Sequence, residues 1–156
     1  MLNSTNAESG YSSQIKAVSS TTFTVRDVDA NGNANVNKSG SNYIAYCFAE
    51  IEGFSKFGSY TGNGSTDGTF VYTGFRPAFI MYKRTDTTGN WLMDDNKTST
   101  FNYDSNYLLA ENPDAEGDTT TNTAGHMFDH LSNGFKMRNT NSARNASGGT
   151  YIYMAF

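Results

Sequence analysis

The chain has 156 residues, of which 17% are charged and 14% aromatic, with a formal net charge of −4. This length corresponds to one domain with a real hydrophobic core. The negative charge argues against a nucleic-acid partner, because phosphate binding needs a basic surface. No apolar run is long enough to span a bilayer. The single cysteine, Cys47, excludes an internal disulfide.

Short apolar and aromatic runs separated by Gly, Asn and Asp are typical of strands joined by turns. In chain order, strands are predicted at Thr22–Arg26, Tyr43–Ala49, Phe54–Tyr60, Thr69–Phe75, Ala78–Lys83, Asn90–Asp94, Tyr107–Ala110, Gly134–Arg138 and Thr150–Phe156. Residues 111–123 are polar and acidic and predict a loop, whereas the pattern of 127–131 is ambiguous. So many short strands predict an all-β fold, an antiparallel β-sandwich of the lectin-like jelly-roll kind.

The apolar residues of these strands supply the expected core. We expect six of them to be buried, namely Phe48, Phe70, Phe79, Phe135, Tyr151 and Ile152. Cys47 lies inside the continuous apolar run 43–49, so a buried and unreactive thiol is the expectation.

An imperfect internal repeat relates Ser20–Phe48 to Ser132–Phe156. The residues that match in order are Phe23, Arg26, Gly40, Tyr43, Ile44 and Phe48 with Phe135, Arg138, Gly148, Tyr151, Ile152 and Phe156. A shared order of identities favours a true repeat over two edge hairpins that merely look alike. We therefore expect residues 50–156 to form one β-sandwich unit. Residues 1–49 would be an N-terminal segment whose two strands resemble the end of a preceding unit, or a supplement to the same sheet.

Three sequence blocks carry a resemblance to a known family. They are FGSYTGNG (57–64), DGTFVYTGF (67–75) and GTYIYMAF (149–156). The sequence over most of 40–156 resembles a domain that recurs in tail-fibre-like virion structural proteins of marine bacteriophages, those of cyanobacteria included. The resemblance implies a β-sandwich at the virion surface, made in the host cytoplasm, and a homo-oligomer with a three-fold arrangement. No catalytic residue and no cofactor belong to the pattern, which usually runs several residues beyond Phe156.

Metal ligation is considered at two places. Asp27, Asp29 and Asn31, followed by Gly32, have the alternate oxygen ligands of a calcium loop, but Lys38 stands where a bidentate Glu would be needed. An Asn-Gly hairpin turn explains the same letters. His126 and His130 lack the Glu of a zinc-binding H-E-x-x-H helix, so we expect two ordinary surface or loop histidines.

Catalytic motifs are absent from the sequence, and we expect no enzyme. Asp94 and Asp95 are adjacent, and neighbours on a strand point to opposite faces, so this pair cannot flank one glycosidic bond. Exposed tyrosines and Trp91 are candidates for stacking on a sugar. The sequence thus favours a phage tail-fibre or other appendage module with no cofactor. A capsid decoration protein and a carbohydrate-binding lectin-like module are the alternatives. The expected partners are copies of itself, other virion proteins and a host-surface glycan.

Overall fold

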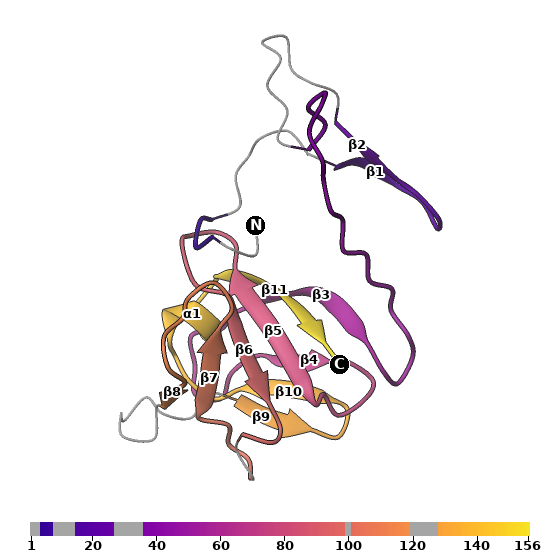
Figure 1. Cartoon of the computed structure of the whole chain (residues 1–156). Coiled ribbons are helices and arrows are strands. Elements are labelled where there is room, and N and C mark those ends of the chain that lie inside the picture. Colours follow the sequence, from indigo (N-terminus) through magenta and orange to yellow (C-terminus); the bar gives the residue numbers. More distant parts are fainter. Residues whose placement is uncertain (1–3, 8–14, 27–35, 99–100, 119–127) are drawn as a thin grey trace. The chain divides into compact units, whose positions relative to one another are not determined.

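The computed structural model describes residues 4–7, 15–26, 36–98, 101–118 and 128–156. The chain divides into two compact units, one made of Met1–Glu8 with Ala49–Phe156 and the other of Ser9–Phe48. The described residues are mostly β, with antiparallel sheets and one short helix (Figure 1). In this described part, no helix has the length and apolar character needed to cross a membrane.

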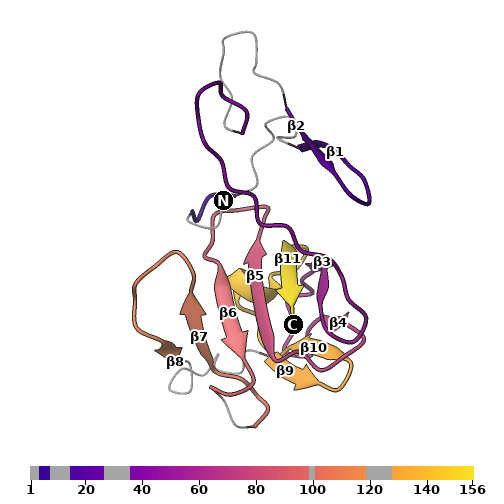
Figure 2. The same ribbon diagram turned by 45° about the vertical axis from the view of Figure 1, so that its right-hand side comes forward.

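The larger unit contains two sheets. The six-stranded sheet consists, in spatial order, of β3 (Lys56–Thr61), β11 (Thr150–Ala155), β5 (Phe79–Arg84), β6 (Leu92–Asp95), β7 (Asn106–Leu109) and β8 (Gly117–Asp118). The three-stranded sheet consists of β4 (Phe70–Tyr72), β10 (Gly134–Met137) and β9 (Phe128–Leu131). The final strand, β11, therefore lies between β3 and β5 inside the larger sheet (Figure 2).

Aromatic side chains from both sheets meet in one core. On the six-stranded sheet, Tyr82 and Tyr153 are buried. Each makes an edge-to-face contact with the other sheet, Tyr82 with Phe128 at 6.3 Å between ring centroids and Tyr153 with Phe135 at 5.4 Å. Such pairs add to the free energy gained by burying their large apolar area. Of the residues expected in the core, Phe135 and Tyr151 are confirmed as fully buried.

Strand phase accounts for three other core predictions, Phe70, Phe79 and Ile152, which are wrong or only partly right. Side chains alternate between the two faces of a strand, so an error of one residue exchanges inside and outside. In β4 it is Val71 that faces the core, and Phe70 is 45% exposed. In β11, Ile152 is exposed and lies between two buried tyrosines. Phe79 is half-buried beside the fully buried Ile80.

The glycine-rich loop after β3 is held by a buried asparagine. Asn145 lies at the end of the short helix α1 (Ser142–Asn145), and its side chain is fully buried. Its amide nitrogen donates to Asn63 Oδ1, to the Ser65 carbonyl and to the Asn139 carbonyl, and its amide oxygen accepts from Asn63 N. Gly62 passes so close that a Cβ there would lie 2.3 Å from the Ala146 carbonyl oxygen. The hydrogen bonds of Asn145 and the close approach of Gly62 to Ala146 thus account for the TGNGSTDG sequence of this loop.

Apart from Tyr43–Ala49, each predicted strand overlaps an observed one. The ambiguous stretch 127–131 contains β9, and the predicted loop 111–123 contains the two-residue strand β8. Tyr43–Ala49 is not a buried strand, because it has no strand assignment and its residues are exposed. Phe48 and Cys47, both expected to be buried, are exposed with it, because no strand of the described residues pairs with this segment.

The smaller unit repeats a hairpin of the larger one. Its strands β1 (Ile15–Val18) and β2 (Phe23–Val25) pair with Val18 opposite Phe23 and Ala17 opposite Thr24. Strands β9 and β10 pair with His130 opposite Phe135 and Asp129 opposite Lys136. These are the same positions under the sequence repeat, so the two hairpins share their register over these pairs.

The turn that follows each hairpin is also repeated. Gly40 has a φ of 75° and its counterpart Gly148 has a φ of 74°, a left-handed conformation that favours glycine. The turn is closed by a hydrogen bond from Ser41 N to the Lys38 carbonyl in one copy and from Gly149 N to the Ala146 carbonyl in the other.

A tyrosine hydroxyl completes the likeness between the two turns. The Tyr43 hydroxyl accepts from Lys38 N at 2.9 Å, and the Tyr151 hydroxyl accepts from Ala146 N at 2.8 Å. The two segments therefore share their pairing register and their turn geometry.

Candidate functional site

Of the residues considered as site candidates in the sequence, Trp91, Asp94, Asp95 and His130 lie in the part of the chain that the structure describes. Trp91 immediately precedes β6 and is 8% exposed, so the expectation of an exposed ring is wrong. Its ring lies 5.9 Å from the Lys83 ammonium, and its backbone N–H donates to the Glu111 carboxylate. A ring enclosed in this way cannot stack on a sugar without moving.

The calcium candidates Asp27, Asp29 and Asn31 lie outside the described residues, as does His126, so their roles stay predictions. Among the residues that are described, no group of three or more potential ligands could hold a metal ion.

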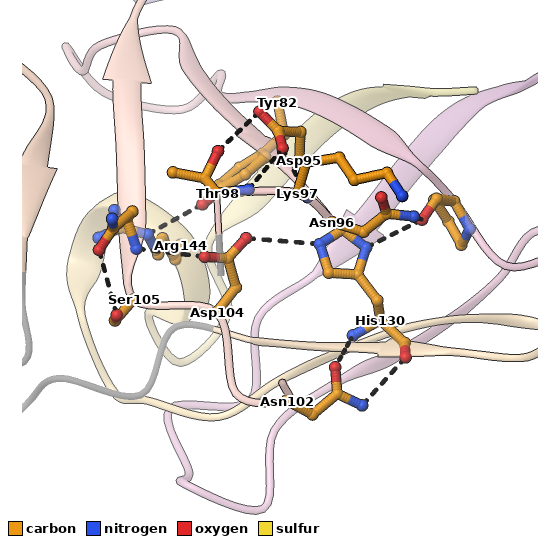
Figure 3. A network of polar contacts seen from close by, with 12 residues as sticks. Tyr82, Asp95, Asn96, Lys97, Thr98, Asn102, Asp104, Ser105, His130 and Arg144 are labelled. Carbon is orange, nitrogen blue, oxygen red and sulfur yellow. Dashed lines mark hydrogen bonds and ion pairs between the residues drawn. The ribbon is translucent and has the colours of Figure 1, made fainter. Parts of the chain in front are cut away.

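His130 is not the surface residue that the sequence suggested. It points inward from β9 because it alternates with Asp129 along the strand, and it is buried. Its Nδ1 lies 3.0 Å from the Pro77 carbonyl oxygen, which requires Nδ1–H to donate. Its Nε2 lies 3.4 Å from Asp104 Oδ2 (Figure 3). Asn102 holds the strand from the side, because its amide accepts from His130 N and donates to the His130 carbonyl.

A second cluster of buried polar residues consists of Asp94, Tyr82 and Arg144. The Arg144 Nε donates to the Tyr82 hydroxyl at 2.9 Å, and the guanidinium lies 4.7 Å from the centroid of the Tyr107 ring. Burial alone would lower the pKa of Arg144, but Tyr82 and Asp94 outweigh that effect, and the pKa is raised. The guanidinium therefore remains charged inside the protein.

Asp94 is the carboxylic acid whose pKa is most strongly shifted among the described residues. Its side chain points inward from β6 and is only 3% exposed. Burial raises the pKa of Asp94 to about 8, an effect that the charge of Arg144 only partly offsets. Neither carboxylate oxygen has a partner with hydrogen-bond geometry among the described residues, although the Tyr82 hydroxyl is near. Asp94 is therefore mostly protonated at neutral pH, because the neutral acid costs less to bury.

This buried cluster is poorly placed for chemistry on a large substrate. The pocket next to Asp94 has a volume of about 60 Å³ and is also lined by Asp95 and Glu116. Asp94 is almost completely enclosed, so a large substrate cannot reach its carboxyl group in this conformation. Asp95 lies on the other face of β6 and caps the turn that follows, accepting from Lys97 N and Thr98 N. The arrangement can fix the position of α1 against β5 and β6, but it offers no accessible acid–base pair.

An open polar pocket lies elsewhere, on the outer side of β9 and β10. It has a volume of about 490 Å³ and is lined by Thr66, Asp67, Tyr103, Asp129 and Arg138. Arg138 Nε lies 3.1 Å from Asp129 Oδ2, which holds the guanidinium at the pocket wall. An aromatic side chain beside hydrogen-bonding groups is the usual lining of a site for a small polar ligand.

The outer face of β4 adds aromatic surface to the same sheet. Phe70 pairs with Lys136 and Tyr72 with Gly134, so all four positions share the outer face. Tyr72 is 64% exposed. Sequence reasoning missed this face, although the alternation in GFKMR (134–138) places Lys136 and Arg138 together on one side of the strand.

Comparison with known proteins gives one match. Over residues 1–156 the chain matches, and therefore belongs to, the family described as "Domain of unknown function (DUF7483)". No curated protein matches it. No solved structure matches it either.

Proposed function

We propose that this chain is a structural module of a bacteriophage particle, carried on the virion surface in a tail fibre or another appendage. The observation that carries this proposal is the repeat of the β1–β2 hairpin and its turn by the β9–β10 hairpin and its turn. Repeated β units in one chain are the building blocks of extended protein arrays. The resemblance of the FGSYTGNG, DGTFVYTGF and GTYIYMAF blocks to tail-fibre-like proteins supplies the phage context.

The absence of an accessible acid–base pair around Asp94 supports a non-enzymatic role. A polar surface with few charges suits contacts with other proteins, and we propose that the chain assembles with copies of itself and with other virion proteins. The fold we propose is a β-sandwich, supported by the core that both sheets share. The jelly-roll topology expected from the sequence is part of the same proposal.

Antibodies raised against the purified chain test the proposal on purified particles of a phage that encodes it. Immunogold labelling at the tail or its fibres is the expected result, and labelling spread over the head would favour capsid decoration instead. Particles without label, from a lysate in which the chain is abundant, would contradict both assignments.

A carbohydrate-binding role is a second candidate, favoured by the open pocket at Tyr103 and Arg138 and by exposed Tyr72 on the same sheet. Aromatic rings stack on the apolar faces of sugars, while charged and amide groups bond their hydroxyls. A glycan array with the wild-type chain and the variants Tyr72→Ser and Tyr103→Ala tests it. Signals that both substitutions weaken would support the role, and signals that neither changes would exclude this face as the site.

A further inference from the structure

The segment Tyr43–Phe48 has the composition of a buried strand without the surroundings of one. Tyr43 is 49% exposed, Ile44 is 82% exposed, and Tyr46 is exposed as well. No strand in the described part of the chain pairs with it. Consecutive exposed apolar residues are unfavourable in water, and they mark a surface that another protein covers.

The repeat identifies the environment that this segment fits. From Gly40 onward it aligns without a gap to the stretch that starts at Gly148, so Tyr43–Phe48 corresponds to Tyr151–Phe156. That stretch contains β11, whose residues pair with β3 on one side and β5 on the other. In β11, Tyr151, Tyr153 and Ala155 face the core. Their counterparts are Tyr43, Ala45 and Cys47.

The hairpin ahead of this segment lacks a neighbour in the same way. Strand β10 pairs with β9 on one side and with β4 on the other. Its counterpart β2 pairs with β1, and the described residues supply no second partner. The smaller unit thus corresponds to the part of a β unit that contains β9, β10 and β11, without the part that contains β3 to β8.

We infer that residues 15–26 and 36–48 supply the closing strands of a second β unit, whose remaining strands come from a separate stretch of protein with the pattern of residues 49–118. In that complex, Tyr43–Phe48 lies between strands equivalent to β3 and β5, and β2 pairs with a strand equivalent to β4. Nothing in this pairing depends on a phage origin, because it follows from the register and the turns.

A second copy of this chain is a poorer partner than a stretch of protein in which the place between the strands equivalent to β3 and β5 is unfilled. Its place between β3 and β5 is already filled by β11, with Tyr153 packed edge-to-face on Phe135. Replacing Tyr153 with the small side chain of Ala45 would leave a cavity, and cavities in a core are costly. Opposite Tyr153 lies Gly58, where a Cβ would come within 3.1 Å of the tyrosine ring. We therefore expect the true partner to carry a side chain, and no glycine, opposite Ala45.

Cys47 makes this inference testable, because it is the single cysteine and its counterpart Ala155 is fully buried. The reaction of Cys47 with a thiol reagent would be compared in the full chain and in a longer chain with residues 49–126 repeated ahead of residue 1. The added segment brings no further cysteine. In the full chain, reaction at the rate of the denatured protein is expected. In the longer chain, the rate should fall about 100-fold, because the thiol then reacts only when the strand opens.

Two variants of the longer chain sharpen the test. Ala45→Tyr restores the pattern of β11 beside the glycine of the added segment and should slow the reaction further. In Ile44→Pro, the proline has no backbone N–H to donate to a neighbouring strand, so this variant should restore fast labelling. Fast labelling of both the longer chain and its Ala45→Tyr variant, with a normal cooperative melt of the 49–156 unit, would overturn the inference. Slow labelling of the full chain alone, together with a dimer mass, would overturn the assignment of the partner in favour of a second copy.

Discussion

The substitution Asp94→Asn tests the buried polar cluster through pH. Asparagine has nearly the volume of aspartic acid and stays neutral, so the variant retains the uncharged form that the fold favours. The pKa of Asp94 is about 8 in the folded protein and 3.8 as the ordinary value. Between these values the folded state keeps a proton that the unfolded state has lost. The wild-type protein is therefore stabilised below about pH 4 by this group and loses that contribution as pH rises toward 8.

The size of the effect follows from the linkage between protonation and folding. One proton of difference changes the free energy of unfolding by about 1.4 kcal/mol per pH unit. The range from pH 5 to pH 7 lies between the two pKa values of Asp94, 3.8 and about 8. Over this range the free energy of unfolding of the wild-type protein should fall by about 3 kcal/mol relative to that of the variant. The variant should thus overtake the wild type in stability, or extend its lead, as pH rises.

Urea unfolding followed by the fluorescence of Trp91 measures this difference, because the ring is buried in the folded state and is the single tryptophan. Asp95→Asn is the matched control. Burial raises the pKa of Asp95, but hydrogen bonds from Lys97 and Thr98 outweigh it and lower the pKa, so both states are ionised above about pH 5. The control should run parallel to the wild type from pH 5 to pH 7. If the free energy of unfolding of Asp94→Asn also changed with pH in parallel with that of the wild type, the assignment of a neutral buried acid would be refuted.

The remaining predictions concern the core, the loop and the smaller unit. Phe135→Ala should reduce the free energy of unfolding by about 3–5 kcal/mol, and Phe70→Ala by less than about 1 kcal/mol, in urea titrations; equal losses would contradict the strand phase. Asn145→Ala leaves several backbone and side-chain partners of a buried amide unpaired and should lower stability by about 2–4 kcal/mol, seen as a lower melting temperature. Deleting residues 1–49 should leave 50–156 folded but unable to assemble; light scattering after size exclusion decides, and an unfolded product would assign 1–49 to the same β unit.

The strands themselves could be predicted from the sequence because turn residues separate the apolar runs. The phase of a strand, meaning which of its side chains face the core, is harder to predict where adjacent residues are all apolar. In FVY (70–72) and FIM (79–81) no polar residue alternates with the apolar ones, so the pattern does not say which side chain faces the core. Residues 43–49 were misjudged for another reason. Their sequence is that of an inner strand, but the strands that would cover it are not provided by the described residues.

The polar sites depend on contacts between distant parts of the chain. Asp94 and Asp95 are the same residue type at adjacent positions. Only the strand phase and the packing of Arg144 determine that Asp94 is the buried acid and that Asp95 caps the turn after β6. The same holds for His130, whose partners Pro77 and Asp104 lie 53 and 26 residues away in sequence. No local pattern encodes such a network, because it forms only after the sheets have packed.

A cryo-electron-microscopy reconstruction of an assembled particle from a phage that encodes this chain would test the proposed role as a virion module. Density for the chain is expected in a surface appendage, with residues 15–26 and 36–48 built into a neighbouring β unit as its β9-, β10- and β11-like strands. Particles that lack the chain, while it is present in the same lysate, would contradict its role as a virion module.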